Sequence, residues 1–389
     1  MKAVFCHQGE LNLRECAEPR PGEGQILISV SRCGICGSDL HARRHCDHMG
    51  ALATRAGLNG LMRASENVVM GHEICGEVLE TGPTTDRKLR PGTPVVALPI
   101  LRGAGGGIEM LGFSARANGG YAERMLVEAS LTLPVPNGLS ADMAAMTEPM
   151  AVGWHAVRRG DVRKRDVAIV IGCGPVGLAV ICALKAKGVS HILAADFSPE
   201  RRALALACGA DTIIDPAATS PFANWQSFGF IGTVEGLVQT ALQTRAALGK
   251  LPIPWWHGWR IAQWLGAAPK RPVIFECVGV PGVLQSIIDE APLTSRIVVV
   301  GVCMESDRIE PSMAINKEIE MRFALGYSPL EFRDTLHMIA SGKLQPATML
   351  TGTVGLAGIE TAFDILGRAG AHCKILVNPA STALAPQEP

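Results

Sequence analysis

An apolar strand that runs into a glycine turn constrains the fold of this chain more than any other feature. Residues 167–171 are VAIVI, and residues 172–177, GCGPVG, match the pattern G-x-G-x-x-G. A helical segment follows the turn, and Asp196 closes the next apolar segment, 19 residues after Gly177. This combination is typical of a dinucleotide-binding unit made of a strand, a helix and a second strand.

The three glycines of the turn have separate roles in such a unit. Gly172 allows the tight turn, Gly174 lets the backbone approach a pyrophosphate, and Gly177 lets the helix pack closely on the strand. Asp196 is suited to bind a ribose 2′-hydroxyl, and its carboxylate would repel a 2′-phosphate. The sequence therefore predicts NAD rather than NADP, although residues 201–202 are both arginine.

Apolar segments continue to alternate with helical ones beyond this unit. Ser198-Pro199 predicts the start of a helix, and the segments themselves lie at 191–196, 211–215, 273–278 and 296–302. This alternation predicts the α/β class, with a Rossmann, doubly wound parallel sheet. Residues 167–184 carry no charge, but three glycines and a proline interrupt them, so a strand, turn and helix explain them better than a membrane span.

The first 150 residues have a different character. They are rich in glycine and proline and contain short apolar runs, which predicts a β-rich domain with long loops. A chain of 389 residues is long enough for two domains. We therefore assign residues 1–155 to this β-rich domain and residues 156–326 to a dinucleotide-binding domain, and we expect residues 327–389 to return to the first.

A tryptophan-rich insertion at about 217–270 interrupts the second domain. Five of the six tryptophans of the chain lie there. Three interpretations stay open: a small helical subdomain that packs its own aromatic side chains, an oligomer contact, and a cover over a substrate channel.

The charges of the chain balance. Lys plus Arg and Asp plus Glu number 36 each, so no net field draws nucleic acid or a membrane, and we expect neither as a partner. The segment MKAVFCHQGELNL at the N-terminus lacks the apolar core of a signal peptide, which predicts a cytoplasmic protein. The 12 unevenly spaced cysteines are typical of reduced thiols rather than of a disulfide framework.

A C-x-x-C pair at Cys33 and Cys36 raises the question of a redox or zinc site. No cysteine occurs from residue 76 to 172, so the second pair of a zinc ribbon is missing. His72 in the segment GHE and Glu148 at the domain junction are further metal-ligand types. A thiolate, an imidazole and a carboxylate leave one position of a tetrahedral zinc open, which is typical of catalytic sites. We assign Cys36 to the metal and regard Cys33 as a bystander.

Three segments together resemble a known family. CGICGSDLH (33–41), GHEICGEVLETG (71–82) and TEPMAVGWHAV (147–157), followed by GCGPVG, resemble the zinc-dependent alcohol dehydrogenases of the medium-chain dehydrogenase/reductase (MDR) superfamily. The resemblance covers nearly the whole chain except the insertion and the tail. It implies a GroES-like catalytic domain, a Rossmann domain, a C-terminal return, and a homodimer or homotetramer.

The resemblance also implies roles for individual residues. Cys36, His72 and Glu148 would ligate the catalytic zinc, with Glu73 beside the metal and exchanging onto it during turnover. Whether Glu73 or Glu148 is the resting third ligand stays open. Asp39 would hydrogen-bond a ligand imidazole and so fix its orientation. A further set would relay protons or contact the cofactor: Ser38 and His41 as the proton relay, Val152 near the nicotinamide, Lys374 at the pyrophosphate, and Pro175, Val176, Val278 and Val300 as additional cofactor contacts.

The chain departs from the family in two places. Most members carry four clustered cysteines for a structural zinc, whereas residues 89–116 contain none, so we expect one catalytic zinc and no structural zinc. The segment from His41 to Val69 is long and holds His45, Cys46 and His48, which we interpret as a loop beside the active site rather than a metal site.

We therefore expect hydride transfer between an alcohol and NAD. The apolar residues 98–114 favour a fairly hydrophobic alcohol, whereas Glu148 favours the alternative, a polyol, sugar or amino-alcohol dehydrogenase of the sorbitol or threonine type. A zinc-free reductase on the same fold and a non-catalytic NAD-binding protein are weaker alternatives, and metal analysis and NADH formation distinguish them.

Overall fold

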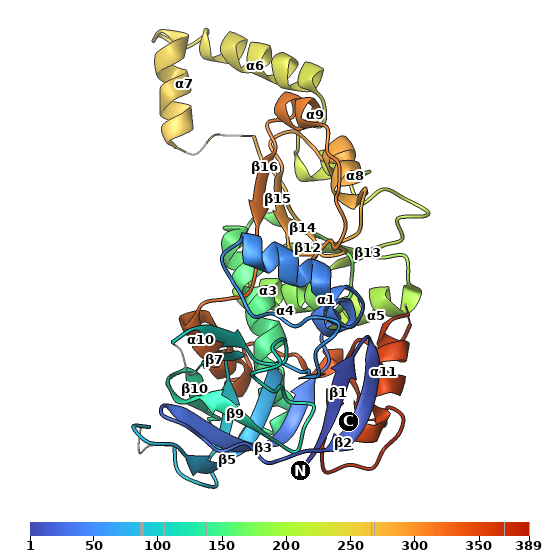
Figure 1. Ribbon diagram of the computed structural model, residues 1–389. Helices are drawn as coiled ribbons and strands as arrows, with labels where there is room; N and C mark the ends of the chain where they lie inside the picture. The colour runs from blue at the N-terminus through green and yellow to red at the C-terminus, as the bar shows by residue number, and fades with distance from the viewer. Residues whose placement is uncertain are drawn as a thin grey trace.

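The computed structural model describes residues 1–85, 89–103, 106–136, 138–265, 267, 269–368 and 370–388. A β-rich part contains both ends of the chain, and an α/β part built on a parallel sheet lies next to it (Figure 1). A hairpin of two helices extends from the far end of the α/β part, away from the β-rich part (Figure 1).

The α/β part contains a six-stranded sheet in which every pair is parallel. The spatial order is β13-β12-β11-β14-β15-β16. Strand order therefore reverses between β11 and β14, and the crevice at such a switch point is where α/β sheets bind dinucleotides. The predicted doubly wound sheet is confirmed, and its strands are β11 (Val167–Ile171), β12 (His191–Ala195), β13 (Thr212–Ile214), β14 (Val273–Glu276), β15 (Arg296–Val299) and β16 (Glu320–Phe323).

Helices of this part begin and end where local sequence signals predict. Helix α5 starts at Pro199, and the Ser198 hydroxyl accepts a hydrogen bond from the Arg201 amide. Helix α4 ends at Gly188, whose φ of 76° is easily adopted only by glycine. The helices are α3 (Thr147–Arg159), α4 (Pro175–Lys187), α5 (Pro199–Cys208), α8 (Val283–Glu290), α9 (Pro311–Asn316) and α10 (Pro329–Ala340).

The uncharged residues 167–184 form β11 and most of α4, as the interpretation of a strand, turn and helix requires. Within the described ranges, no helix combines the length and apolar character needed to cross a bilayer. The bounds of the two domains stay a prediction, and α3 runs without a break across residue 155.

The β-rich part is organised around β3, which pairs antiparallel with β5, β9 and β18. Because β18 lies close to the C-terminus, this pairing brings the end of the chain into a sheet built mainly by its beginning. The strands are β1 (Lys2–His7), β2 (Glu10–Glu15), β3 (Gln25–Gly34), β4 (Val68–Val69), β5 (Glu73–Thr81), β6 (Pro94–Ala97), β7 (Ile100–Arg102), β8 (Ile108–Met110), β9 (Arg124–Glu128), β10 (Thr132–Pro134), β17 (Leu350–Val354) and β18 (Lys374–Val377); helices α2 (Ala141–Ala145) and α11 (Ile359–Leu366) accompany them.

The segment from His41 to Val69 is not the continuous loop that we predicted. Helix α1 (Gly37–Arg55) occupies its first half, with a kink at His45, where φ is −131° and ψ is 23°. Buried Ala42, Cys46 and Gly50 recur every four residues and explain the helix, because this spacing places them on one face. Residues 41–49 contain neither glycine nor proline, which favours a helix. Our prediction of a loop did not use this signal.

The insertion forms two helices, α6 (Val234–Leu248) and α7 (Trp255–Trp264). Phe222 and Phe230 at its base are buried in the core on one face of the parallel sheet, and Trp225 packs against them. Trp255 and Trp259 meet edge to face with ring centroids 6.1 Å apart. Arg245 of α6 lies over the Trp255 ring of α7, 5.5 Å from its centroid, so the two helices pack on each other, while the base is fixed to the sheet.

Candidate active site

The glycine turn between β11 and α4 has the geometry of a phosphate-binding turn. Gly172 has φ of 91°, a conformation that side chains disfavour. A methyl group added to Gly177 would overlap the carbonyl oxygen of Gly172, so helix and turn pack in contact. By contrast, a methyl group added to Gly174 would meet no atom within 4 Å, so the start of α4 faces open space. Pro175 and Val176 follow as the first residues of α4. The turn thus fits a pyrophosphate at a helix N-terminus.

Asp196 connects the end of β12 to this turn. Its carboxylate accepts hydrogen bonds from the amides of Cys173 and Ser198, at 2.7 and 2.8 Å. Arg202 donates to the Asp196 carbonyl at 2.7 Å and forms an ion pair with Asp215 at 3.1 Å. Arg202, one of the two arginines that could have favoured NADP, is therefore already bound to Asp215 and to the Asp196 carbonyl. The Asp196 carboxylate itself lies at the turn.

Two valines predicted to contact the cofactor follow the carboxyl ends of neighbouring strands. Val278 follows β14, and its side chain lies against Gly172. Val300 follows β15 and is buried. We did not predict a role for Glu276, which holds the backbone after β14 in place. Its buried carboxylate accepts hydrogen bonds from the amides of Val278 and Gly279, at 2.7 and 2.8 Å. An acidic residue inside the apolar segment VIFECV was the signal for it.

A candidate metal site lies where β3, α1 and β5 meet. The donor atoms of Cys36, His72 and Glu73 all lie within 4.8 Å of one another. Pairing of Gly34 on β3 with Glu73 on β5 brings the two sequence motifs together. A side chain at position 34 would overlap the Glu73 carboxylate, so this approach requires glycine. Sulfur, nitrogen and oxygen donors at this separation fit zinc, whose bonds are about 2.0–2.3 Å long.

Asp39 holds the imidazole of His72 in place. Its carboxylate lies 3.2 Å from Nδ1 of His72, and it accepts hydrogen bonds from the Tyr121 hydroxyl at 2.8 Å and the Cys36 amide at 2.9 Å. Nε2 is thereby directed toward the metal site, where the Ser38 hydroxyl lies 3.4 Å away. Burial lowers the pKa of His72, but Asp39 and Cys36 together raise it more, and the pKa ends well above its usual value.

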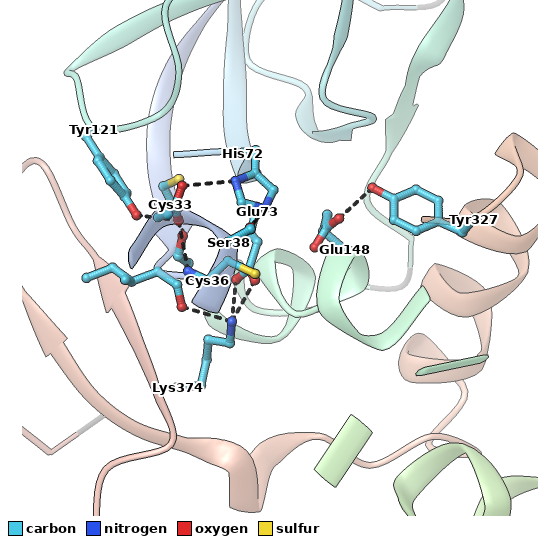
Figure 2. Close-up of polar contacts among 12 residues, drawn as sticks. Cys33, Cys36, Ser38, His72, Glu73, Tyr121, Glu148, Tyr327 and Lys374 are labelled. Atoms are coloured by element: carbon cyan, nitrogen blue, oxygen red, sulfur yellow. Dashed lines mark hydrogen bonds and ion pairs between the residues drawn. The ribbon is translucent and has the colours of Figure 1, made fainter. Parts of the chain in front are cut away.

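Lys374 lies at Glu73 and not at the glycine turn (Figure 2). Its ammonium group donates to both oxygens of the Glu73 carboxylate, at 2.6 and 2.9 Å, and to the Ile35 carbonyl at 3.0 Å. Both side chains are fully buried. Our prediction of Lys374 at the pyrophosphate is therefore wrong, because β18 pairs with β3 and delivers its first residue to the metal site.

Glu148 lies on α3, between the candidate metal site and Tyr327 (Figure 2). It is not part of the group of donors within 4.8 Å. The Tyr327 hydroxyl donates to its Oε1 at 2.9 Å, and Tyr327 stacks on Phe332. Burial raises the pKa of Glu148 to about 7, although His72 opposes this. Sequence reasoning missed Tyr121 and Tyr327, and no local signal marks either residue.

The remaining predicted residues lie on helices α1 and α3. His41 is half-buried on α1, and among the described residues no hydrogen bond joins it to Ser38. Burial, followed by His45 and Arg44, lowers the pKa of His41. Val152 is half-buried on α3. His45, Cys46 and His48 lie on α1 and do not form a group of converging metal donors in the described part of the chain.

An aromatic ring borders the metal site. The ring of Phe113 lies 4.8 Å from that of His72, tilted by 40°. Phe113 follows the β7–β8 hairpin, which comes from the apolar residues 98–114. The apolar segment 98–114 therefore contributes an aromatic side chain to the border of the site.

Comparisons with known proteins identify the family of the chain. Residues 22–137 match the family model of the alcohol dehydrogenase GroES-like domain. The chain is 31% identical over 390 residues to the (R,R)-butanediol dehydrogenase of Bacillus subtilis (strain 168), covering 97% of this chain and 100% of that one. It is 25% identical to the sorbitol dehydrogenase of Bos taurus, covering 95% and 93%.

A solved structure gives the same result. The crystal structure of 2R,3R-butanediol dehydrogenase from Bacillus subtilis superposes with a TM-score of 0.73 at 29% identity, covering 97% of this chain and 99% of that one. The predicted fold and the predicted resemblance are both confirmed. The chain belongs to the zinc-dependent alcohol dehydrogenase family of the MDR superfamily.

Proposed function

We propose that the protein oxidises a secondary alcohol reversibly to a ketone, with NAD as the acceptor and one catalytic zinc ion. The observation that carries this proposal is the convergence of Cys36, His72 and Glu73 within 4.8 Å. A zinc ion held there would act as a Lewis acid that lowers the pKa of the substrate hydroxyl. A single ion is proposed because residues 76–172 contain no cysteine for a second, structural site.

Cys36, His72 and Glu148 are the protein ligands in this proposal. Both oxygens of Glu73 are engaged by Lys374, whereas only one oxygen of Glu148, the one bound by Tyr327, accepts a hydrogen bond from the described part of the chain. Glu148 is therefore the carboxylate more easily recruited as the resting third ligand. Glu73 would replace it only if the ion pair with Lys374 opened.

Ser38 and His41 form the proposed route for the substrate proton. The Ser38 hydroxyl lies beside Nε2 of His72; it accepts the substrate proton as it releases its own proton toward His41. Burial lowers the pKa of His41, which keeps the imidazole neutral and able to accept a proton near pH 7. An intervening hydroxyl group or water molecule completes the route, because the two side chains are not in contact among the described residues.

Two substrate classes have support. A small vicinal diol is favoured by the full-length similarity to butanediol dehydrogenase. A more hydrophobic alcohol is favoured by Phe113, whose ring lies beside His72. A homodimer or homotetramer is the assembly that the family resemblance supports.

A panel of alcohols tests this function directly. We expect NADH absorbance to rise with 2,3-butanediol, and more weakly with apolar secondary alcohols such as 2-octanol and with sorbitol. Metal analysis of the same preparation should give one zinc per chain. Turnover by protein freed of zinc, or zinc-loaded protein that reduces no NAD with any alcohol, would contradict the proposal.

Asp196 should decide between the two nicotinamide cofactors. Replacement by alanine removes an ionised acceptor from the ribose site, a loss of about 1.5–3 kcal/mol, so kcat/KM for NAD should fall about 10–100-fold. The ratio of NADP to NAD use should rise because the repulsion of a 2′-phosphate is lost. Initial rates with both cofactors measure this. Asp215→Ala removes a carboxylate that pairs with Arg202 and accepts a hydrogen bond from the Ala217 amide, away from the glycine turn, so an equal effect there would contradict the assignment.

A further inference from the structure

The α6–α7 hairpin exposes an unusually apolar surface for a segment so far from the core. Trp264 is 85% exposed and Leu265 is 72% exposed, at the end of α7. None of the residues of α6 is buried. The large apolar side chains exposed on the two helices and the turn between them are Val234, Val238, Leu242, Leu251, Ile253, Trp256, Ile261, Trp264 and Leu265. Clusters of this kind mark contact surfaces.

The position of the hairpin excludes one of its three interpretations. It extends beyond the end of the parallel sheet that points away from the β-rich part, where Cys36 and His72 lie (Figure 1). It therefore does not cover the substrate channel. The helices do pack their own aromatic side chains, but that packing leaves the apolar surface uncovered.

The charges beside the apolar surface are positive. A groove of about 550 Å³ runs between α6 and α7, over Val238 and Leu242 and against the tryptophans of α7. Its charged lining residues are Arg245 and Arg260, and no acidic residue lines it. The Arg245 guanidinium lies over the Trp255 ring at 5.5 Å from its centroid. From residue 233 to 265, Glu235 is the only acidic residue.

A second group of positive charges lies at the base of the hairpin. Arg163 and Arg165 precede β11, and Lys270 joins α7 to β14, so all three lie at the amino edge of the sheet. They line a cavity of about 680 Å³ and form no ion pair with any described residue. The two acidic residues of that cavity are engaged, Asp161 by Arg296 and Asp166 by the Arg163 amide.

These charges argue against a second copy of the chain as the occupant. Two hairpins packed face to face would bring Arg245 and Arg260 of both chains together, with only Glu235 to oppose them, and like charges in an interface are costly. An anionic lipid surface complements the same charges. Tryptophan rings suit the boundary between headgroups and acyl chains, and leucine and isoleucine suit its apolar side.

We propose that the α6–α7 hairpin docks the protein on anionic membranes. Trp256, Trp264 and Leu265 enter the interface, and Arg163, Arg165 and Lys270 contact the headgroups. Burial of apolar side chains in the bilayer alone, or contact of a basic cluster with the headgroups alone, gives weak and reversible binding. The two together give stable binding. The balanced charge of the whole chain led us to expect no membrane partner, but the charge is unevenly distributed and these residues form a local exception.

Vesicle sedimentation tests this docking. The full chain should sediment with vesicles of phosphatidylcholine and phosphatidylglycerol, more weakly with phosphatidylcholine alone, and less as salt is added. Tryptophan emission should shift to shorter wavelength on binding, because five of the six tryptophans lie in the insertion. The double variants Trp264→Ser/Leu265→Ser and Arg163→Glu/Arg165→Glu should each bind more than about tenfold more weakly.

Matched variants elsewhere keep the test specific. Leu384→Ser and Arg20→Glu change exposed side chains in the β-rich part and should sediment like the unchanged protein. Circular dichroism checks that every variant folds. Absence of sedimentation with either vesicle, or equal sedimentation with neutral lipid, would overturn the proposal. So would a Trp264→Ser/Leu265→Ser variant whose oligomer dissociates while its vesicle binding is unchanged, since a second copy would then cover this surface.

Discussion

Cys36→Ser should remove zinc and alcohol oxidation together. A serine hydroxyl is a much poorer zinc ligand than a thiolate, and the remaining donors cannot close the site without it. Because Lewis-acid activation is worth several kcal/mol in the transition state, kcat/KM should fall by at least about a thousandfold. Metal analysis after gel filtration and NADH formation with 2,3-butanediol measure the two losses on one sample.

Cys33→Ser is the matched control for this substitution. Cys33 is the other half of the C-x-x-C pair, but it lies buried in β3, and its thiol contacts the neighbouring Gly34 carbonyl at 3.7 Å. The variant should keep its zinc and most of its activity. If Cys33→Ser lost zinc as completely as Cys36→Ser, the pair would act as a unit and the assignment of one ligand would be wrong.

Lys374→Met should destabilise the protein more than any surface substitution. Its ammonium group is the ion-pair partner of the fully buried Glu73 carboxylate, and methionine fills the space without the charge. Removing one partner of a buried ion pair costs about 3–5 kcal/mol of the free energy of unfolding, because the other charge is left unpaired in the interior. Urea denaturation of zinc-free protein measures this cost without a contribution from metal binding.

The double variant Glu73→Gln/Lys374→Met separates the ion pair from the packing. Once the carboxylate is neutralised, the missing ammonium group no longer leaves a buried charge, so much of the lost stability should return. Lys343→Met, at an exposed position, should be nearly neutral. A double variant as unstable as Lys374→Met would show that the lysine acts through its other contacts, and our interpretation of the pair would fail.

Features that depend on neighbours in the chain could be predicted from the sequence. The glycine turn, Asp196 after the second strand, and the start of α5 at Pro199 all depend on residues a few positions apart. Backbone conformation, helix capping and the alternation of apolar segments act over this range. They were sufficient to predict five of the six strands of the parallel sheet, all but β16, and the family resemblance.

Helix α1 shows where that range ends. The spacing of Ala42, Cys46 and Gly50 was present in the sequence, but the helix also contains two glycines and three histidines, which weaken a helical prediction. Packing of the buried face against the β-rich core stabilises the helix, and packing of this kind depends on residues elsewhere in the chain.

The arrangement of side chains at the candidate metal site depends on the tertiary structure. Cys36 and His72 were predicted as ligands from their chemical types, but the sequence could not show which groups surround them. The partner of Glu73 is Lys374, 301 residues away, and the partner of Glu148 is Tyr327, 179 residues away. The pairing of β3 with β5 and β18 decides the first of these contacts, and the second joins α3 to the segment before α10. Strand register is set by the burial of whole faces and by backbone hydrogen bonds between distant segments, and no local pattern contains that information.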